Sequence, residues 1–283
     1  MNFNERLEEL VTSALAEDIG EGDHSTLCCI PPQTKGSAVL KIKQDGVLAG
    51  VKVAEFIFNF LEPSSVFSVQ KNDGEKMTAG DIAFTVESSV HTILKAERLV
   101  LNIMQRMSGI ATLTHSYTEK LNGYRSKLLD TRKTTPNFRL LEKEAVKIGG
   151  GHNHRFGLFD MIMLKDNHID YAGGIEPAIE KAAAYIQQHP RLKIEIETRN
   201  LEEVKRVMAA GKVHRIMLDN FSPEQIKEAL QVINGRYETE ASGGITIDNI
   251  QAYAETGVDF ISSGSIIHQA KSLDLSLKAK IIS

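Results

Sequence analysis

This sequence of 283 residues has very little cysteine, no long apolar run and no large excess of charge. The only two cysteines, Cys28 and Cys29, are adjacent, so a disulfide between them is geometrically awkward and a metal site would need further ligands. No run approaches the roughly 20 apolar residues of a membrane-spanning helix. The acidic, amphipathic start MNFNERLEEL does not resemble a secretory signal, so we expect a cytoplasmic protein.

The charge balance also excludes classes of partner. With 33 basic and 37 acidic residues, the chain is mildly acidic and has no extended basic stripe with aromatic residues, so we do not expect nucleic-acid binding. A hydrophobic content of 42% and a charged content of 25% are ordinary for a soluble globular enzyme. The length allows one large or two modest domains with a substantial core.

Positive charge is nevertheless concentrated between residues 130 and 168, among Gly-rich turns. The cationic or imidazole side chains there include Arg132, Lys133, Arg139, His152, His154, Arg155 and Lys165. Because the formal net charge of the whole chain is only -4, this positive field is local and must be compensated elsewhere. The pattern predicts a binding site for a small polyanion.

Two regions with different hydrophobic periods follow each other along the chain. Helical spacing over residues 3–17, alternation from Gly36, a short helix through Phe60, strands near Val66 and Ile82, and a long helix from about Ser89 predict an α+β domain. After Leu121, short apolar strands alternate with longer helical patterns. The strands are KLLD, MIMLK, KIEIE, RIMLD, YETEA and DFISS. Such repetition predicts parallel strands with helical crossovers.

Residues of chemically useful types, five polar ones and a glycine, stand at the carboxyl ends of the predicted strands. They are Thr131, Lys165, Glu197, Asp219, Ser242 and Gly264. In an α/β barrel these ends form the catalytic face, so the six positions are expected to meet in space. Any one of them could be an ordinary loop residue, but the recurrence of such residues after all six predicted strands favours a functional site.

Two Gly-rich turns follow the last two strands and predict a phosphate site. They are Ser242, Gly243, Gly244 and Ser263, Gly264, Ser265. Glycine lets backbone N–H groups approach a phosphate closely, and barrels often bind phosphate at their last strands. The alternative is two plain turns at helix entries.

Glu197 and Asp219 end two consecutive strands in the middle of the predicted barrel. Paired carboxylates that face a polyphosphate usually bind it through Mg2+. They could also be ion-pair partners of Lys133 and Lys165, and both interpretations can hold at once. Glu195 shares a strand face with Glu197, so it stays an alternative ligand.

Ordered motifs along nearly the whole chain resemble the quinolinate phosphoribosyltransferase family. The motifs are EDIGEGDHST, GVLAGV, AERLVLNIMQRMSGIAT, TRKTTP, KEAV, GGGHNHR, KDNH, IEIE, IMLDNF, ASGGIT and ETGVDFISSG. One departure is Asn137, where the family usually has Gly. Asn tolerates left-handed backbone angles, so we expect the turn to be preserved.

The resemblance implies a type II phosphoribosyltransferase fold. Residues 1–107 would form an N-terminal α+β, sandwich-like domain and residues 108–283 an incomplete TIM-like α/β barrel of about seven strands. The seventh strand is placed loosely between Ala145 and His154, and the last helix is expected to pack back on the N-terminal domain. The implied activity is phosphoribosyl transfer from phosphoribosyl pyrophosphate to quinolinate with decarboxylation, giving nicotinate mononucleotide, pyrophosphate and CO2 in NAD biosynthesis.

The resemblance also implies roles for single residues. Substrate binding falls to Arg98, Thr131, Arg132, Lys133, His154, Arg155, Lys165, Glu197 and Asp219, among which Lys133, Lys165, Glu197 and Asp219 are catalytic. Glu197 and Asp219 hold Mg2+, and the two Gly-rich turns hold the 5′-phosphate. Arg98 would reach the neighbouring subunit's site, which implies a homodimer, although on its helix alone it could be a solvated charge. His152 is interpreted as a surface group.

Three other functions remain open from the residues. An aldolase or lyase could use Lys165 as a Schiff-base nucleophile, but it would not need so many other cations. A diverged pyrophosphorylase-like relative could take another substrate, although Lys165, Arg132 and Arg155 are all retained. A phosphosugar-binding regulator would bind ligand without turnover.

Overall fold

The computed structural model describes residues 2–281, and the chain divides into two compact units. The first unit contains the residues up to His115, the segment Thr134–Gly150 and the residues from Ile267 onward. The second contains Ser116–Lys133 and Gly151–Ile266. Each unit is therefore assembled from segments that are separated in sequence. The single boundary after residue 107 stays a prediction.

The first unit contains a four-stranded antiparallel sheet in the order β12-β1-β5-β3. These strands are β12 (Leu275–Ile281), β1 (Lys35–Ile42), β5 (Ile82–Ser89) and β3 (Val66–Val69). The expected last helix is wrong, because this segment is strand β12, with Leu277 opposite Leu40. Apolar residues alternate there, so that Leu275 and Leu277 are both buried, which is the period of a strand.

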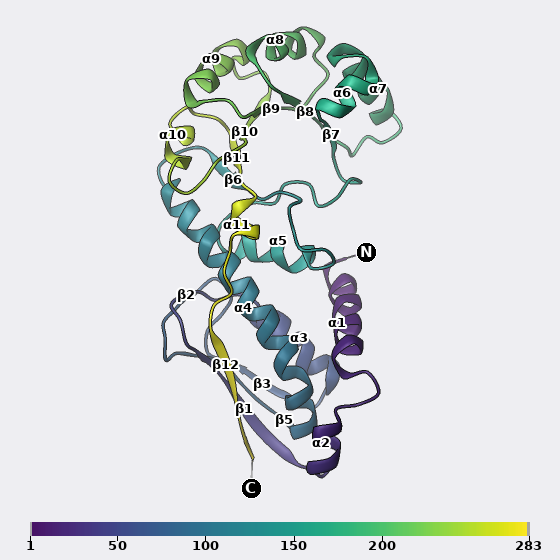
Figure 1. The fold of residues 1–283 in the computed structure, drawn as a ribbon, viewed down its shortest axis with the longest axis vertical. Helices are drawn as coiled ribbons and strands as arrows, with labels where there is room; N and C mark the ends of the chain where they lie inside the picture. Colours follow the sequence, from purple (N-terminus) through teal and green to yellow (C-terminus); the bar gives the residue numbers. More distant parts are fainter. Residues whose placement is uncertain (1, 282–283) are drawn as a thin grey trace. The chain divides into compact units, whose positions relative to one another are not determined.

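The first unit also contains helices, and three of them confirm the helical segments predicted over residues 3–17, through Phe60 and from about Ser89. The helices are α1 (Phe3–Ile19), α2 (His24–Cys29), α3 (Val51–Leu61), α4 (Val90–Lys120) and α5 (Arg139–Ile148). Helices α3 and α4 run along the sheet (Figure 1). Phe84 of β5 lies 4.4 Å from Phe67 and 6.3 Å from Phe58 of α3, measured between ring centroids. A short ribbon, β2 (Gly46–Val47) with β4 (Lys76–Met77), completes the unit.

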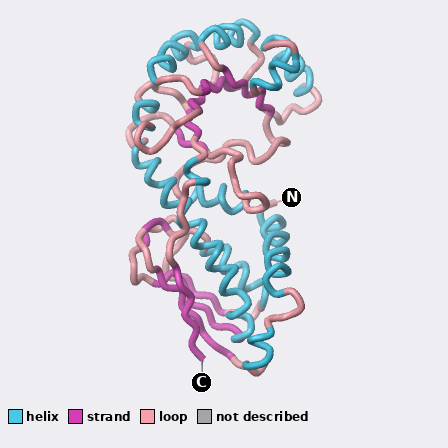
Figure 2. Tube along the Cα trace, in the orientation of Figure 1, coloured by secondary structure: helices cyan, strands magenta, loops and turns pink. Residues whose placement is uncertain are grey.

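The second unit contains a six-stranded parallel sheet in the order β6-β11-β10-β9-β8-β7. Its strands are β6 (Lys127–Leu129), β7 (Ile162–Leu164), β8 (Ile194–Thr198), β9 (Arg215–Asp219), β10 (Glu238–Ser242) and β11 (Phe260–Ser262). The outer helices are α6 (Asp166–Ala172), α7 (Ile175–Ile186), α8 (Leu201–Ala210), α9 (Pro223–Ile233) and α10 (Ile250–Ala254). The strands form an inner arc with helices outside it (Figure 2). This confirms the predicted α/β unit and all six of its strands.

The predicted seventh strand is reduced to a single parallel bridge between Leu129 and His152. The His152 amide donates to Leu128 O, and its carbonyl accepts from the Asp130 amide. Two residues later, the His154 amide donates instead to a side-chain oxygen, Oδ1 of Asp130, at 2.8 Å. The ladder therefore stops after one bridge, because a carboxylate replaces the next backbone acceptor.

The turn that contains Asn137 keeps the geometry expected from the family pattern. Asn137 has a φ of 62°, in the left-handed region where glycine is the usual residue. Asn is among the side chains that enter this region most readily, so the departure from Gly leaves the turn intact.

Candidate active site

All six strands of the second unit point the same way, so their carboxyl ends share one edge. Asp219 at the end of β9 is the register partner of Ser242 at the end of β10. Lys165 directly follows β7, and Glu197 is the penultimate residue of β8. The polar residues predicted at strand ends are thus collected on one face, as the parallel topology requires.

Two lysines and two carboxylates come together at the centre of this face. Lys165 Nζ donates to Glu197 Oε2 at 3.1 Å. Partial burial and the nearby charge of Glu197 raise the pKa of Asp219 above its usual value, while Lys165 and Lys133 act to lower it. This mutual influence places the four groups within electrostatic reach of one another.

The Glu197 and Asp219 pair fits a divalent cation. Carboxylate oxygens are hard donors of the type that Mg2+ prefers, and the charge of Glu197 adds to burial in raising the pKa of Asp219. A cation between them would relieve this repulsion. Glu195, the alternative ligand, is fully buried and faces His154 instead.

A second group of cations lies on the segments after β6 and His152. Burial and the neighbouring charge of Arg132 lower the pKa of Arg155, so the two guanidinium groups lie near each other. Thr131 Oγ1 accepts a hydrogen bond from the Lys133 amide at 3.1 Å. This bond shapes the turn formed by residues 131–133. Two adjacent guanidinium groups suit a ligand that bears more than one carboxylate.

His154 is buried and its ring is held on both sides. Nδ1 accepts from the Arg155 amide at 2.7 Å, and Nε2 lies 2.9 Å from Glu195 Oε2 and 3.4 Å from Glu240 Oε2. Burial lowers the pKa of His154, but hydrogen bonds to Glu195 and Glu240 and the charges of these carboxylates raise it overall. The contact with the Arg155 amide belongs to the ring form that carries its proton on Nε2, facing the two carboxylates.

Glu195, Glu240 and Arg215 are residues that the sequence analysis missed as a cluster with His154. Arg215 Nη1 donates to Glu240 Oε2 at 2.9 Å, and the Arg215 guanidinium lies 4.0 Å from the Phe260 ring centroid. A signal was present, since KIEIE and YETEA carry charged residues at alternate positions of apolar strands. Charges on the inward face of a buried strand indicate a polar barrel interior.

The same cluster is the one group of potential metal ligands found among residues 2–281. His154, Glu195 and Glu240 offer ligand atoms that all lie within 4.8 Å of one another. The Arg215 guanidinium already supplies positive charge to Glu240, so a cation has less to compensate here than at Asp219.

Of the two Gly-rich turns after β10 and β11, the first needs glycine for its backbone conformation. Gly243 has a φ of 94°, and a Cβ there would lie 2.2 Å from Asn220 Oδ1, so only glycine fits. In the other turn, Ser263 Oγ donates to Ile245 O at 2.9 Å, and Ser265 Oγ lies 3.0 Å from Tyr117 OH. Because both hydroxyls are buried and bonded within the protein, any phosphate contact at this turn would come from backbone N–H groups.

Arg98 and His152 are both exposed to solvent. Arg98 is exposed on α4 in the first unit, with Glu97 as a neighbour at 3.8 Å. His152 is exposed, as expected of a surface histidine in a Gly-rich loop.

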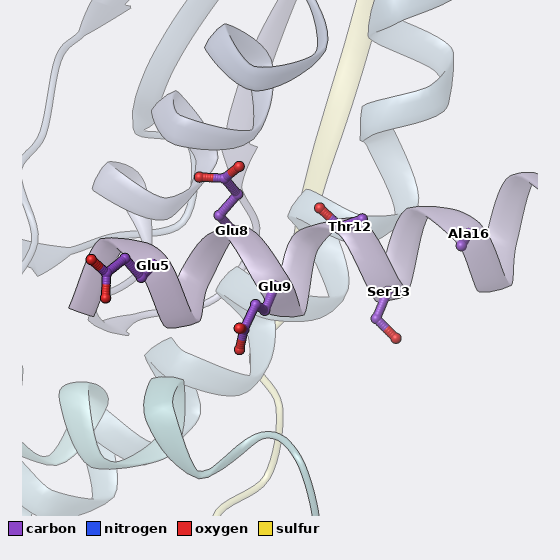
Figure 3. Close-up of a pocket in the computed structure, with 6 residues that line it drawn as sticks. All are labelled: Glu5, Glu8, Glu9, Thr12, Ser13 and Ala16. Carbon is purple, nitrogen blue, oxygen red and sulfur yellow. The ribbon is translucent and has the colours of Figure 1, made fainter. Parts of the chain in front are cut away.

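The hollow drawn in Figure 3 lies along helix α1 and has a different character from this face. Its volume is about 530 Å3, and its lining residues are Glu5, Glu8, Glu9, Thr12, Ser13 and Ala16. Three glutamates repel carboxylate and phosphate ligands, and no predicted site residue lines this hollow. It is therefore not the polyanion site.

Family comparisons identify the chain. Residues 23–108 match the model of the quinolinate phosphoribosyl transferase N-terminal domain, and residues 110–278 match that of the C-terminal domain. The chain belongs to the quinolinate phosphoribosyltransferase family. It is a decarboxylating pentosyltransferase that acts on quinolinate in NAD biosynthesis, with an N-terminal antiparallel-sheet domain and a C-terminal parallel α/β domain.

Relatives along the full length agree with this assignment. A mitochondrial quinolinate phosphoribosyltransferase of Nicotiana tabacum is 43% identical over 96% of this chain and 82% of its own. A chloroplastic nicotinate-nucleotide pyrophosphorylase of Arabidopsis thaliana is 44% identical over the same shares. The crystal structure of NadC from Streptococcus pyogenes is 41% identical, with a TM-score of 0.91 over 98% of this chain and 97% of that one. The type II phosphoribosyltransferase fold expected from the motifs is confirmed.

None of the helices formed by residues 2–281 combines the length and apolar character that a membrane crossing requires.

Proposed function

We propose that the strand-end residues of the second unit perform this transferase reaction with phosphoribosyl pyrophosphate as the donor. The observation that carries the proposal is the meeting of Lys133, Lys165, Glu197 and Asp219 at one face of the sheet. Lysine charges there can neutralise a pyrophosphate, and carboxylates can hold its metal. The products are nicotinate mononucleotide, pyrophosphate and CO2.

Bond formation needs no general base at this site. The quinolinate ring nitrogen carries a lone pair, which attacks the anomeric carbon of the ribose as the bond to pyrophosphate breaks. The leaving electron pair stays on the pyrophosphate oxygen, where Lys133 and Lys165 stabilise it. The ribose resembles an oxocarbenium ion in the transition state, and the charges of Glu197 and Asp219 favour that cation.

Loss of CO2 follows from the charge on the product ring. Once the nitrogen is bonded to ribose, the ring is a pyridinium. The carboxylate beside the nitrogen then leaves as CO2, and the electron pair left on the ring carbon is stabilised by the adjacent positive nitrogen. A proton from solvent completes nicotinate mononucleotide. The protein's part is to hold the ring in place through these steps.

Separate groups recognise the two carboxylates of quinolinate and the ribose phosphate. Arg132 and Arg155 bind the carboxylates with the help of Thr131 and His154, because arginine forks match carboxylate geometry. The turns of Ser242, Gly243, Gly244 and of Ser263, Gly264, Ser265 hold the 5′-phosphate through backbone N–H groups.

The ion pair of Lys165 also weakens the aldolase alternative. A Schiff-base lysine must have its nitrogen free to attack a carbonyl group, whereas Lys165 Nζ donates to a Glu197 oxygen at 3.1 Å. The phosphoribosyl reaction uses that charge directly.

Mg2+ is the proposed cofactor, held by Glu197 and Asp219. When bound, it would neutralise the pyrophosphate and so favour departure of this group. The two carboxylates orient the donor, and Lys133 and Lys165 complete the positive surroundings of the leaving oxygen.

Asp219→Asn is expected to raise the Mg2+ concentration needed for half-maximal activity about 10-fold or more, because one ligand charge is lost. The measurement is a Mg2+ titration of initial rates at saturating substrates. Asp248→Asn, on the segment between β10 and α10, serves as the control. An Asp219→Asn variant whose Mg2+ dependence matches that of the wild type would move the ligand role elsewhere.

A homodimer with Arg98 shared between subunits is the proposed assembly, supported by the exposure of Arg98 on α4. Arg98→Ala and Lys133→Ala proteins are each expected to be nearly inactive. After subunit exchange, random pairing gives one intact site in half of the dimers, so about a quarter of the wild-type activity should return. Mixtures that regain no transferase activity would place Arg98 in the active site of its own chain.

A cytoplasmic location is also part of the proposal.

A further inference from the structure

Glu195 and Glu240 are buried carboxylates that the proposed chemistry does not use. Both are 0% exposed, on strands β8 and β10. One oxygen of each carboxylate, Oε1 of Glu195 and Oε1 of Glu240, accepts no hydrogen bond. Burying a carboxylate with incomplete pairing is costly, and an apolar side chain at the same place would often be more stable. Their presence calls for a role besides stability.

Both carboxylates face the same ring. His154 Nε2 lies 2.9 Å from Glu195 and 3.4 Å from Glu240. On the opposite edge of the ring, Nδ1 accepts from the Arg155 amide, and the His154 amide donates to Asp130. The ring therefore links the barrel interior to the backbone that carries Arg155.

Neighbouring strands hold the two carboxylates in place. Glu195 is the register partner of Arg215 on β9, and Glu240 is the register partner of Phe260 on β11. Arg215 donates to Glu240 at 2.9 Å and stacks over Phe260. The His154 ring therefore faces carboxylates that are carried by paired strands of the parallel sheet.

We propose that Glu195 and Glu240 are positioning residues for quinolinate, which fix the His154 ring and, through its Nδ1, the backbone of Arg155. This inference rests on the proposed function, in which His154 and Arg155 bind the carboxylates of quinolinate. Neither glutamate touches the substrate. They act by removing the freedom of groups that do, which lowers the entropy lost when quinolinate binds.

The test compares three Glu→Gln variants of the full-length protein. Glu195→Gln and Glu240→Gln keep side-chain size but replace the carboxylate beside His154. Glu238→Gln is the matched control, because Glu238 lies on β10 and also bonds Arg215, without an ion pair to His154. KM and kcat are measured for quinolinate and for phosphoribosyl pyrophosphate, together with Tm.

We expect the KM for quinolinate to rise about 10-fold or more in Glu195→Gln and Glu240→Gln, with the KM for phosphoribosyl pyrophosphate changed less than about 2-fold. A purely structural role would lower Tm and affect both substrates alike. An unchanged quinolinate KM in both variants, or an equal rise for both substrates, would overturn the proposal. If either Glu195→Gln or Glu240→Gln does not fold, the quinolinate KM of the other variant tests the proposal.

A spectroscopic signature tests the ring directly. The 15N resonances of the His154 side chain should move in the Glu195→Gln and Glu240→Gln proteins and stay in place in Glu238→Gln. Resonances that move in none of the variants would also contradict the proposal. The failures are separable: if the wild type does not turn over quinolinate, the proposed function fails, whereas normal wild-type turnover with unaffected variants rejects only the positioning role.

Discussion

Lys165→Ala is expected to lower kcat about 100- to 1,000-fold, because it removes a preformed positive charge from the leaving pyrophosphate. Lys165 lies at the carboxyl end of β7 with its ammonium 3.1 Å from Glu197, so it is already oriented when substrate arrives. Without it, two carboxylates would face the polyphosphate with one lysine fewer to offset their charge. The effect should fall mainly on kcat, since the charge develops in the transition state.

Steady-state kinetics with both substrates would measure this effect. Lys181→Ala is the matched control, because Lys181 is an exposed lysine of α7 whose ammonium donates only to the carbonyl of Ala172. It should keep nearly full activity. A Lys165→Ala enzyme whose kcat stays within about 2-fold of the wild type would show that this lysine does not act on the leaving group.

Arg106→Met is expected to lower the free energy of unfolding by about 3–5 kcal/mol, because it leaves the buried carboxylate of Glu142 without its cationic partner. Arg106 Nε and Nη2 donate to Glu142 Oε1 at 3.0 and 2.8 Å, and Glu142 is 0% exposed. The same guanidinium also donates to the carbonyls of Ile267 and Ala270. Met fills a similar volume but satisfies none of these acceptors.

Urea unfolding of the variant and of Arg206→Met would test this expectation. Arg206 also donates twice to a glutamate, Glu176, but that pair is exposed, so its loss should lower stability by no more than about 1 kcal/mol. Similar small decreases in the free energy of unfolding of both variants would mean that burial does not strengthen the Arg106 pair.

Glu142 also accepts hydrogen bonds from Thr135, two residues after Lys133. We therefore expect Arg106→Met to loosen the turn that contains Thr135.

The barrel strands could be predicted because local pattern and tertiary environment agree there. Each of the six apolar runs ends at a polar residue such as Glu197 or Asp219, and parallel topology alone brings those ends together. The left-handed turn at Asn137 could also be predicted, since it depends on the intrinsic preference of one residue.

Features that depend on distant partners could not be predicted in the same way. Strand β12 forms because residues after 274 pair with β1, more than 230 positions earlier, and short alternation alone did not distinguish it from a helix. The bridge at His152 ends because of one side chain, Asp130. Arg215 and Glu240 are neighbours only because β9 lies beside β10, so sequence spacing does not reveal their ion pair.

The most direct measurement is turnover with phosphoribosyl pyrophosphate and Mg2+, with quinolinate in one reaction and nicotinate in another, while mononucleotide and CO2 are followed. We expect nicotinate mononucleotide and CO2 in equal amounts from quinolinate, and no product from nicotinate, because the proposed role of the cation group after β6 and His152 is to bind two carboxylates. Turnover of nicotinate alone, or of neither acid, would contradict this assignment of the site.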